Sequence, residues 1–250
     1  MPPAFPLQPD VIPPRSGSIV ILTGAGISKE SGLETFRDAG GIWSQVRLED
    51  VATPEAFARD PVRVHAFYNM RRARHRTMDI KPNAAHHAVV KLQQAWPGGV
   101  TVVTQNVDTL HDEAGTKDLI HMHGTYAQAR CNFCDAVVPR LGDLSVTDIC
   151  ASCGKDKGMR PNVVWFGEMP LHMERITAAL RDCALFISIG TSGSVYPAAG
   201  FVTMVKRSAD AHTVELNLEP SQGATLFAEA HYGPATQIVP AYVESLLQSL

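Results

Sequence analysis

Short apolar runs rich in β-branched residues recur along the chain. They occupy residues 19–23, 100–104, 119–121, 185–189, 213–216 and 236–239. These runs are mostly apolar on both faces, which is typical of parallel strands covered on both sides. Between them, apolar residues recur at intervals of three or four and predict helices at residues 61–78, 84–96, 173–182, 198–208 and 241–250. The alternation predicts an α/β protein with a parallel sheet.

Five of the six predicted strands run directly into small or polar residues. These follow at 24–28, 105–108, 121–124, 190–193 and 217–219. Ligands bind outside the carboxyl ends of the strands in an open parallel sheet, so these ends together predict one lined pocket. For any single strand end, the ordinary preference of turns for Gly, Asn, Thr and Ser explains the residues equally well.

The first strand end carries part of a dinucleotide-binding fingerprint. Gly24 and Gly26 permit a tight turn and a close approach to a pyrophosphate, but Lys29 replaces the third glycine. No acidic strand end follows about twenty residues later, which disfavours an ordinary dehydrogenase. Residues 31–43 instead form a polar stretch containing glycines, and this predicts a flexible loop over a cofactor.

Length and composition narrow the class of protein. The 250 residues suffice for one large hydrophobic core and a smaller second one. A content of 45% hydrophobic and 19% charged residues excludes disordered, collagen-like and coiled-coil chains. No run approaches the ~18 apolar residues of a transmembrane helix, and a net charge of −3 disfavours a general nucleic-acid binder. Residues 1–15 are proline-rich without a signal-peptide pattern, so we expect a flexible arm and a cytoplasmic protein.

Four of the five cysteines form two pairs with the spacing of a zinc site, namely Cys131, Cys134, Cys150 and Cys153. Two disulfides are the alternative, but they need an oxidising compartment that nothing else in the sequence supports. Four thiolates complete a tetrahedron and leave no position for a substrate water, so the metal is expected to be structural. Cys183 begins an apolar run and is expected to be an inert core thiol.

A set of motifs in order resembles the sirtuin family, and in particular bacterial NAD-dependent protein-lysine deacylases. Besides the four cysteines, the motifs are Gly-Ala-Gly-Ile-Ser at 24–28, Thr-Phe-Arg at 35–37, Thr-Gln-Asn-Val-Asp at 104–108, His-Gly at 123–124, Val-Trp-Phe-Gly-Glu at 164–168, Gly-Thr-Ser at 190–192 and Asn-Leu-Glu at 217–219. Each motif alone is weak, but the ordered set, spanning residues 15–248, is specific. Val107 stands where isoleucine is more usual.

The resemblance implies one catalytic domain over residues 16–250. Its large Rossmann-like part would comprise residues 16–43, 80–124 and 160–250, and its small part the helical residues 44–79 and the zinc ribbon 125–159. An acyl-lysine tunnel would lie between them, with Phe36 and Arg37 on a cofactor loop that closes over both substrates. The residues implied to bind NAD are Gly24, Ala25, Gly26, Ser28, Phe36, Arg37, Gln105, Asn106, Asp108, Gly190, Thr191, Ser192, Asn217, Glu219 and Ala235.

The resemblance also implies the chemistry, in which the acyl group passes from lysine to ADP-ribose and nicotinamide is released. His123, directly before a glycine, would be the general base. Asn106 and Asp108 would position the nicotinamide and the ribose. The residues alone leave His111 and His121 as alternatives, because a buried histidine is often only structural.

The segment at residues 162–168 reads as extended. In the family, a peptide substrate adds beside it as a strand, pairing main chain to main chain. The implied contacts are Val164, Phe166, Gly167 and Glu168, whereas Trp165 also reads as an apolar core residue.

Five arginines lie on the predicted helix at residues 61–78, namely Arg63, Arg71, Arg72, Arg74 and Arg76. For most of them a solvated helix face is the favoured interpretation. Tyr68 and Arg71 share a helical face and resemble the Tyr-x-x-Arg pattern of sirtuins that accept succinyl, malonyl or glutaryl lysine. The resemblance therefore implies removal of carboxyl-tipped acyl groups alongside acetyl.

Two other functions remain open, a protein ADP-ribosyltransferase on the same scaffold and a non-catalytic zinc-ribbon binding module. A binding module has no use for Asn106, Asp108 and His123 together, and a transferase places ADP-ribose on protein rather than on the departing acyl group. As partners we expect acylated-lysine proteins, and we expect no stable nucleic-acid complex, no membrane association and a monomeric enzyme.

Overall fold

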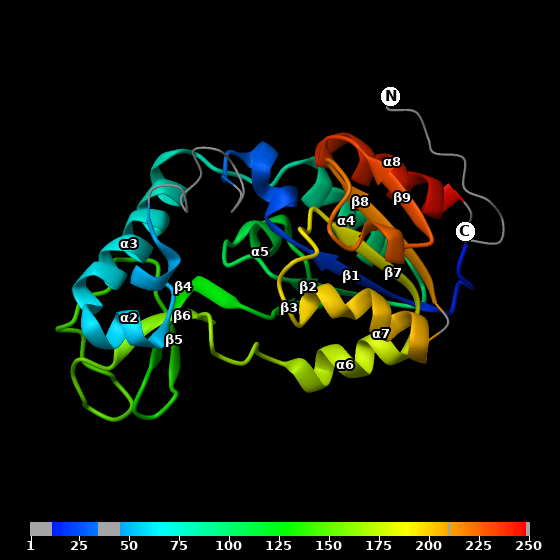
Figure 1. Cartoon of the computed structure of the whole chain (residues 1–250). Helices are drawn as coiled ribbons and strands as arrows, with labels where there is room; N and C mark the ends of the chain where they lie inside the picture. The colour runs from blue at the N-terminus through cyan, green and yellow to red at the C-terminus, as the bar shows by residue number, and fades with distance from the viewer. Residues whose placement is uncertain (1–11, 35–45, 210, 249–250) are drawn as a thin grey trace.

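A computed structural model describes residues 12–34, 46–209 and 211–248. Its larger part is built around a six-stranded sheet in the order β3-β2-β1-β7-β8-β9, in which every pairing is parallel (Figure 1). The strands are β1 (Ser18–Thr23), β2 (Val100–Thr104), β3 (Leu119–His121), β7 (Cys183–Ile189), β8 (His212–Asn217) and β9 (Glu229–Tyr232). The predicted Rossmann-like parallel sheet is confirmed.

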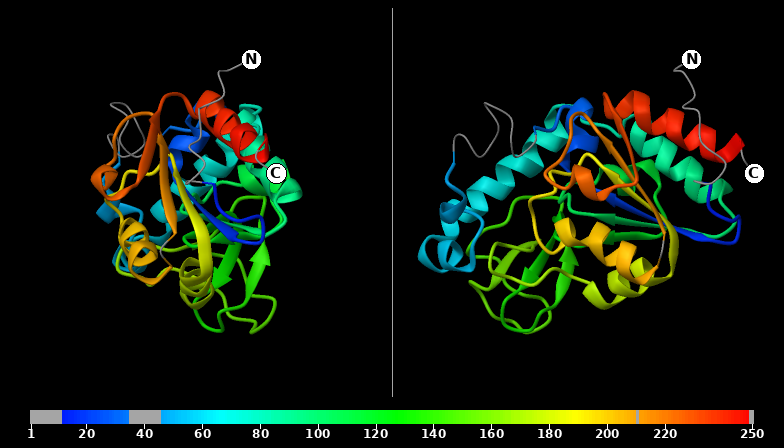
Figure 2. Two further views of the ribbon diagram at one scale, coloured as in Figure 1. Left: turned by 90° about the vertical axis from the view of Figure 1, so that its right-hand side faces the viewer. Right: turned by 45° about the vertical axis from the view of Figure 1, so that its right-hand side comes forward.

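Helices cover both faces of this sheet, with α4 and α8 packed together on one face and α6 and α7 on the other (Figures 1 and 2). These helices are α4 (Ala84–Ala95), α6 (Met173–Asp182), α7 (Phe201–Ser208) and α8 (Ala235–Gln248). Ile19 and Ile21 of β1 belong to the core beneath α4 and α8, while Val20 and Leu22 belong to the core above α6 and α7. Because successive side chains face opposite helix layers, β1 is apolar at nearly every position.

A three-stranded antiparallel sheet in the order β5-β4-β6 forms the smaller part, with two helices beside it (Figure 1). Its elements are β4 (Gly124–Cys131), β5 (Val137–Pro139), β6 (Met159–Val163), α2 (Pro54–Arg59) and α3 (Pro61–Thr77). Phe57, Phe67 and Trp165 pack in the core that joins these helices to the β6 end. The shorter elements are η2 (Ala25–Ser31), η3 (Leu48–Asp50), α5 (Leu110–Ala114), η4 (Ala198–Gly200) and η5 (Ala224–Leu226).

The predicted strand at residues 236–239 is wrong, because these residues lie in α8. Ile238, Val239, Tyr242 and Leu246 are all buried on the face that α8 turns toward the sheet, and their spacing is helical. The sixth strand is β9, whose residues alternate between half-buried and exposed. Among the described residues, no helix has the length and apolar character needed to cross a membrane.

Candidate functional site

The loops that follow β1 and β7 pack directly against each other at the carboxyl edge of the sheet. Gly24 N donates to the Ile189 carbonyl and Gly26 N to the Gly190 carbonyl, at 3.0 and 2.9 Å. A Cβ atom at residue 26 would lie 2.6 Å from the Cα atom of Gly190. Gly190 has a φ of +61°, in the region that favours glycine. The glycines therefore permit two backbone segments to meet where the sequence predicts a phosphate cradle.

Asn106 and Asp108 follow β2 and are buried, with 5% and 7% of their surfaces exposed. The Asn106 side-chain amide donates to the Gly24 carbonyl and to the Ser28 hydroxyl, at 3.1 and 3.2 Å. Ser28 in turn donates to Asp108 Oδ2 at 3.2 Å, and Leu110 N donates to Oδ1 at 3.1 Å. Burial raises the pKa of Asp108, while these two hydrogen bonds oppose the rise. The amide and the carboxyl group are thus held in fixed orientations before any ligand arrives.

His123 lies in the turn between β3 and β4, with its Nδ1 3.1 Å from the backbone oxygen of Gln105. A carbonyl oxygen only accepts, so Nδ1 carries the proton and Nε2 keeps its lone pair. Nε2 forms no hydrogen bond with the residues that the structure describes. Burial lowers the pKa of His123, although the Gln105 carbonyl raises it in part. The imidazole is therefore neutral near pH 7 and able to accept a proton at Nε2.

The two alternative histidines are engaged elsewhere. His121 Nε2 lies 2.9 Å from Asp112 Oδ2. Burial lowers the pKa of His121, but Asp112, the Asn106 backbone and Asp108 together raise it. His111 is 1% exposed, and its Nε2 lies 3.0 Å from the Thr23 hydroxyl. The geometry favours His123 as the general base among the three.

The residues expected to hold the phosphates, the neighbouring ribose and the adenosine end of NAD lie on separate elements. The Asn217 side-chain amide donates to the Thr191 carbonyl at 2.8 Å and so ties the end of β8 to the loop after β7. Ser192 is half-buried beside Thr191, and Glu219 is exposed beyond β8. Ala25 is half-buried at the start of η2. Phe36 and Arg37 lie outside the described residues.

The sequence did not reveal the contact that holds α8 at this edge. Ala235 is the first residue of α8. Glu30 at the end of η2 accepts from both the backbone N and the hydroxyl of Thr236, at 2.9 and 2.6 Å. A carboxylate at a helix N-terminus is favourable, but the two partners stand 206 positions apart, so no local pattern could have indicated it.

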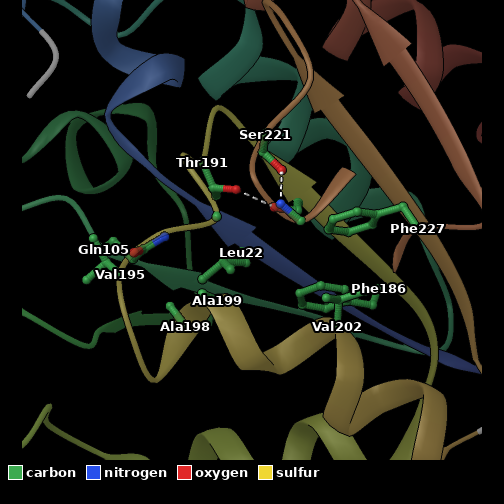
Figure 3. A pocket seen from close by; sticks show the side chains of 13 residues that line it. Leu22, Gln105, Phe186, Thr191, Val195, Ala198, Ala199, Val202, Ser221 and Phe227 are labelled. Carbon is green, nitrogen blue, oxygen red and sulfur yellow. Dashed lines mark hydrogen bonds between the residues drawn. The ribbon is translucent and has the colours of Figure 1, made fainter. Parts of the chain in front are cut away.

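A pocket lies between the loop after β7 and the start of α7 (Figure 3). Leu22, Phe186 and Phe227 supply apolar walls, and Gln105 and Thr191 supply polar groups. Of the residues predicted to bind NAD, these last two line the pocket. The other described residues of that prediction stand outside it.

Tyr68 and Arg71 lie on one face of α3. The helix begins where the Asp60 carboxylate accepts from Arg63 N, with Pro61 at the first helical position. Tyr68 is 3% exposed and Arg71 is half-buried, with its guanidinium carbon 5.8 Å from the Phe67 ring centroid. Burial raises the pKa of Tyr68 and of Asp108. The charge of Arg71 lowers both pKa values. Arg71 therefore carries its charge near the candidate site.

The interpretation of the helix arginines as a solvated face is wrong for Arg72. This side chain is 2% exposed, and its guanidinium donates to the Tyr126 carbonyl and to the Asn69 side chain. Burial lowers the pKa of Arg72 to about 10. Arg72 therefore joins α3 to β4 instead of facing solvent.

The segment expected to be extended bends after β6. Val164 N donates to the His123 carbonyl and Phe166 N to the Ala52 carbonyl, at 2.9 and 3.0 Å. A turn follows at Phe166 and Gly167, where φ of Gly167 is +91°. The extended prediction is therefore wrong for residues 166–168. Phe166 projects into solvent, with 52% of its surface exposed.

Glu168 folds back onto its own segment. Its two carboxylate oxygens accept from the guanidinium of Arg160, at 2.7 and 2.8 Å, and from Trp165 N at 2.8 Å. Arg160 is 3% exposed, so the pair is largely buried. Burial raises the pKa of Glu168, but Arg160, the Trp165 backbone N–H and Arg130 together lower it. The Glu168 side chain therefore stabilises the turn, and any contact with a peptide falls to its main chain.

Cys131, Cys134, Cys150 and Cys153 come together beside β4, with all four sulfur atoms within 4.8 Å of one another. The 131–153 and 134–150 sulfur pairs are 3.8 and 3.7 Å apart, far longer than a disulfide bond. Four sulfurs at about 2.3 Å from one zinc ion are separated by about 3.8 Å in a tetrahedron, so the donor set fits zinc. Cys183 is buried, and burial raises its pKa to about 11, as expected for an inert thiol.

Comparisons with known proteins agree with this arrangement. The sequence profile of the Sir2 family matches residues 24–197. The chain is 54% identical over 232 residues to an NAD-dependent protein deacylase of Escherichia coli (strain K12), covering 93% of this chain and 83% of the relative. It is 53% identical over 233 residues to an NAD-dependent protein deacylase of Vibrio vulnificus (strain YJ016), covering 93% and 95%.

Solved structures resemble the whole fold. One is the crystal structure of a Sir2 homolog–NAD complex, at 33% identity and a TM-score of 0.83, covering 93% of this chain and 90% of the other. Another is a complex of Sir2 with a p53 peptide and NAD+, at 28% identity and a TM-score of 0.73, covering 90% and 92%.

Proposed function

The chain belongs to the Sir2 family, and from this premise we propose that it is an NAD-dependent protein-lysine deacylase whose substrates include carboxyl-tipped acyl groups as well as acetyl. The position of Arg71 is the observation that supports the carboxyl-tipped substrates. Its charge lowers the pKa of both Tyr68 and Asp108, so a cation lies close enough to both side chains to act on them. Succinyl and malonyl groups end in the carboxylate that such a cation attracts.

His123 is the general base of the proposed reaction. NAD, when bound, supplies the ribose that accepts the acyl group. His123 takes a proton at Nε2, because Nδ1 is committed to the Gln105 carbonyl. Asn106 and Asp108 hold their orientations through the Ser28 hydroxyl, and they position the nicotinamide and ribose groups without transferring a proton.

The backbone at the meeting loops after β1 and β7 holds the phosphates, and Asn217, Glu219 and Ala235 line the adenosine end. Residues 16–43, 80–124 and 160–250 form the NAD-binding part, with 44–79 and 125–159 as the smaller part. The four cysteines would hold a structural zinc, because a closed tetrahedron of sulfur ligands leaves no open position for a substrate.

Mass spectrometry of the products tests the proposal. The purified enzyme is incubated with NAD and matched succinyl-lysine, malonyl-lysine and acetyl-lysine peptides. The proposal expects free lysine peptide, nicotinamide and the corresponding O-acyl-ADP-ribose from each. ADP-ribose attached to protein would identify a transferase instead, and no turnover of any peptide would leave a binding module. Turnover of the acetyl peptide alone would remove the carboxyl-tipped substrates from the proposal.

A further inference from the structure

The strongest unexplained contact near the acyl side joins two buried aromatic residues from distant elements. Trp165 Nε1 donates a hydrogen bond of 3.0 Å to the Tyr68 hydroxyl. We propose that Trp165 is a positioning residue for acyl specificity, which aims the Tyr68 hydroxyl proton at the carboxylate of the acyl group. This inference rests on the proposed function, because it assumes that Tyr68 and Arg71 receive a carboxyl-tipped acyl chain.

The Tyr68 hydroxyl has a hydrogen-bond donor among the described residues but no acceptor. Its oxygen accepts from Trp165, but none of the described residues accepts the phenolic proton. Tyr68 is 3% exposed, and a buried hydroxyl rarely leaves its donor unused. Burial raises the pKa of Tyr68, so the proton stays in place at neutral pH. A carboxylate arriving beside Arg71 supplies the missing acceptor.

Trp165 has contacts on both its ring and its backbone. The guanidinium carbon of Arg160 lies 3.4 Å from the centroid of its ring, and the Phe57 ring centroid lies 5.4 Å away. Its backbone N donates to Glu168, which is itself paired with Arg160. The indole therefore has a fixed orientation, and so does the hydrogen bond that it gives.

This arrangement separates two kinds of substrate. The phenolic O–H lies in the plane of its ring, where it can point in either of two directions. An indole that donates to the phenol oxygen occupies one of these directions, leaves the other to the proton, and polarises the O–H bond. A carboxylate gains from both effects. An acetyl group ends in a methyl, which gains from neither. Loss of the indole N–H should therefore weaken turnover of carboxyl-tipped substrates alone.

The first test is a double-mutant cycle with Trp165→Phe, Tyr68→Phe and the double variant. We expect Trp165→Phe to lower kcat/KM for a succinyl-lysine peptide about five- to tenfold, the size of one well-placed hydrogen bond. Acetyl-lysine turnover should stay within about twofold. In the Tyr68→Phe background, Trp165→Phe should have no further effect, because the phenol through which it acts is gone.

The matched control is Trp96→Phe, since Trp96 Nε1 donates a partly buried hydrogen bond of 2.8 Å to the carbonyl of Gly17, which directly precedes β1. This variant should leave both activities unchanged. Equal losses for succinyl and acetyl peptides in Trp165→Phe, no loss for either, or a further loss when Trp165→Phe is added to Tyr68→Phe would each overturn the inference. Arg71→Met distinguishes failure of the proposed function from failure of the role of Trp165. If that variant keeps its preference for succinyl over acetyl peptides, the proposed function is wrong.

A second measurement needs no variant at position 165. In protein labelled with 15N, the indole resonance of Trp165 is assigned from its displacement in Tyr68→Phe. A succinyl-lysine peptide added to the wild-type protein should shift this resonance, because the phenol oxygen becomes a stronger acceptor when its proton is donated. The acetyl-lysine peptide should not shift it. A shift of equal size with both peptides, or with neither, would reject the role of Trp165.

Discussion

The imidazole Nε2 of His111 lies 3.0 Å from the hydroxyl oxygen of Thr23, and both side chains are almost fully buried. Thr23 donates to the Thr104 hydroxyl at 2.9 Å, and Thr104 also accepts from Asn106 N at 3.1 Å. Since Thr23 gives its proton to Thr104, His111 must donate from Nε2. Burial lowers the pKa of His111, so the ring is neutral. A buried chain of hydrogen bonds therefore runs from α5 to the backbone of Asn106.

Removing the donor at position 111 should disturb Asn106. We expect His111→Leu to lower kcat/KM for deacylation about fivefold to tenfold, since the buried hydroxyl oxygen of Thr23 then loses the hydrogen bond that His111 donates. His111→Gln should stay within about twofold, because its amide can donate to Thr23. Steady-state kinetics with NAD as the varied substrate measures both.

Thr116→Val is the matched control for position 111. Its hydroxyl lies 3.5 Å from Nδ1 of His111 but stands outside the chain that leads to Asn106. Its kinetics should match those of the wild type. Equal loss in His111→Leu and His111→Gln would show that only the volume of the ring matters.

The pH dependence of kcat/KM should report His123. Burial lowers the pKa of this imidazole, so its neutral, proton-accepting form persists below the ordinary value of 6.5. Activity should therefore fall as the pH drops through an inflection below 6.5, and it should be level between pH 7 and 8. His121, whose pKa is raised by Asp112, would instead place the inflection above 6.5. His123→Ala should remove most turnover while NAD still binds.

Zinc removal should destabilise the smaller part of the molecule. Metal analysis should find one zinc ion per chain, and a chelator should lower the Tm by about 10 °C or more, because the metal–thiolate bonds hold β4 to the loop around residues 150–153. A thiol reagent should then modify four cysteines, while Cys183 reacts only after denaturation. Cys134→Ser should reproduce the loss of stability, and Cys183→Ala should keep its zinc. A full zinc content in Cys134→Ser would contradict the assignment.

Features written in one short stretch of sequence could be predicted, and features that depend on distant packing could not. The β1 run is apolar because both sheet faces are covered, and the cysteine pairs show their spacing directly. The run at residues 236–239 misled because its β-branched residues stand directly before Pro240, although they share the helical spacing of Tyr242 and Leu246. A short β-branched run was thus interpreted as a strand where the helical period held.

The contacts around the candidate site join residues that no local pattern relates. Trp165 meets Tyr68 across 97 positions only because α3 packs on the turn after β6. Glu168 pairs with Arg160 because the chain reverses at Gly167, a bend that an extended reading of the segment does not contain. The sequence could indicate Tyr68 and Glu168 as candidate site residues, but their hydrogen-bond partners follow from tertiary packing alone.

Arg71→Met should separate the two classes of substrate most sharply. The guanidinium offers two parallel donors to a carboxylate and keeps its charge at neutral pH, and its half-buried position strengthens the attraction. Such a contact is worth about 2–4 kcal/mol, so kcat/KM for a succinyl-lysine peptide should fall about 30- to 1,000-fold. Acetyl-lysine should stay within a few-fold, since it carries no charge for Arg71 to meet.

Arg63→Met is the matched control for that variant. Arg63 lies on the same helix, but its guanidinium pairs with Asp50 at 3.0 Å on an exposed surface, and its side chain is 53% exposed. Its loss should change neither activity measurably, because exposed ion pairs contribute little. Arg71→Lys should recover part of the succinyl activity, since the ammonium keeps the charge but lacks the planar fork. If Arg71→Met lowered both activities equally, its charge would serve Asp108 and not the acyl chain, and the enzyme would be a general deacetylase.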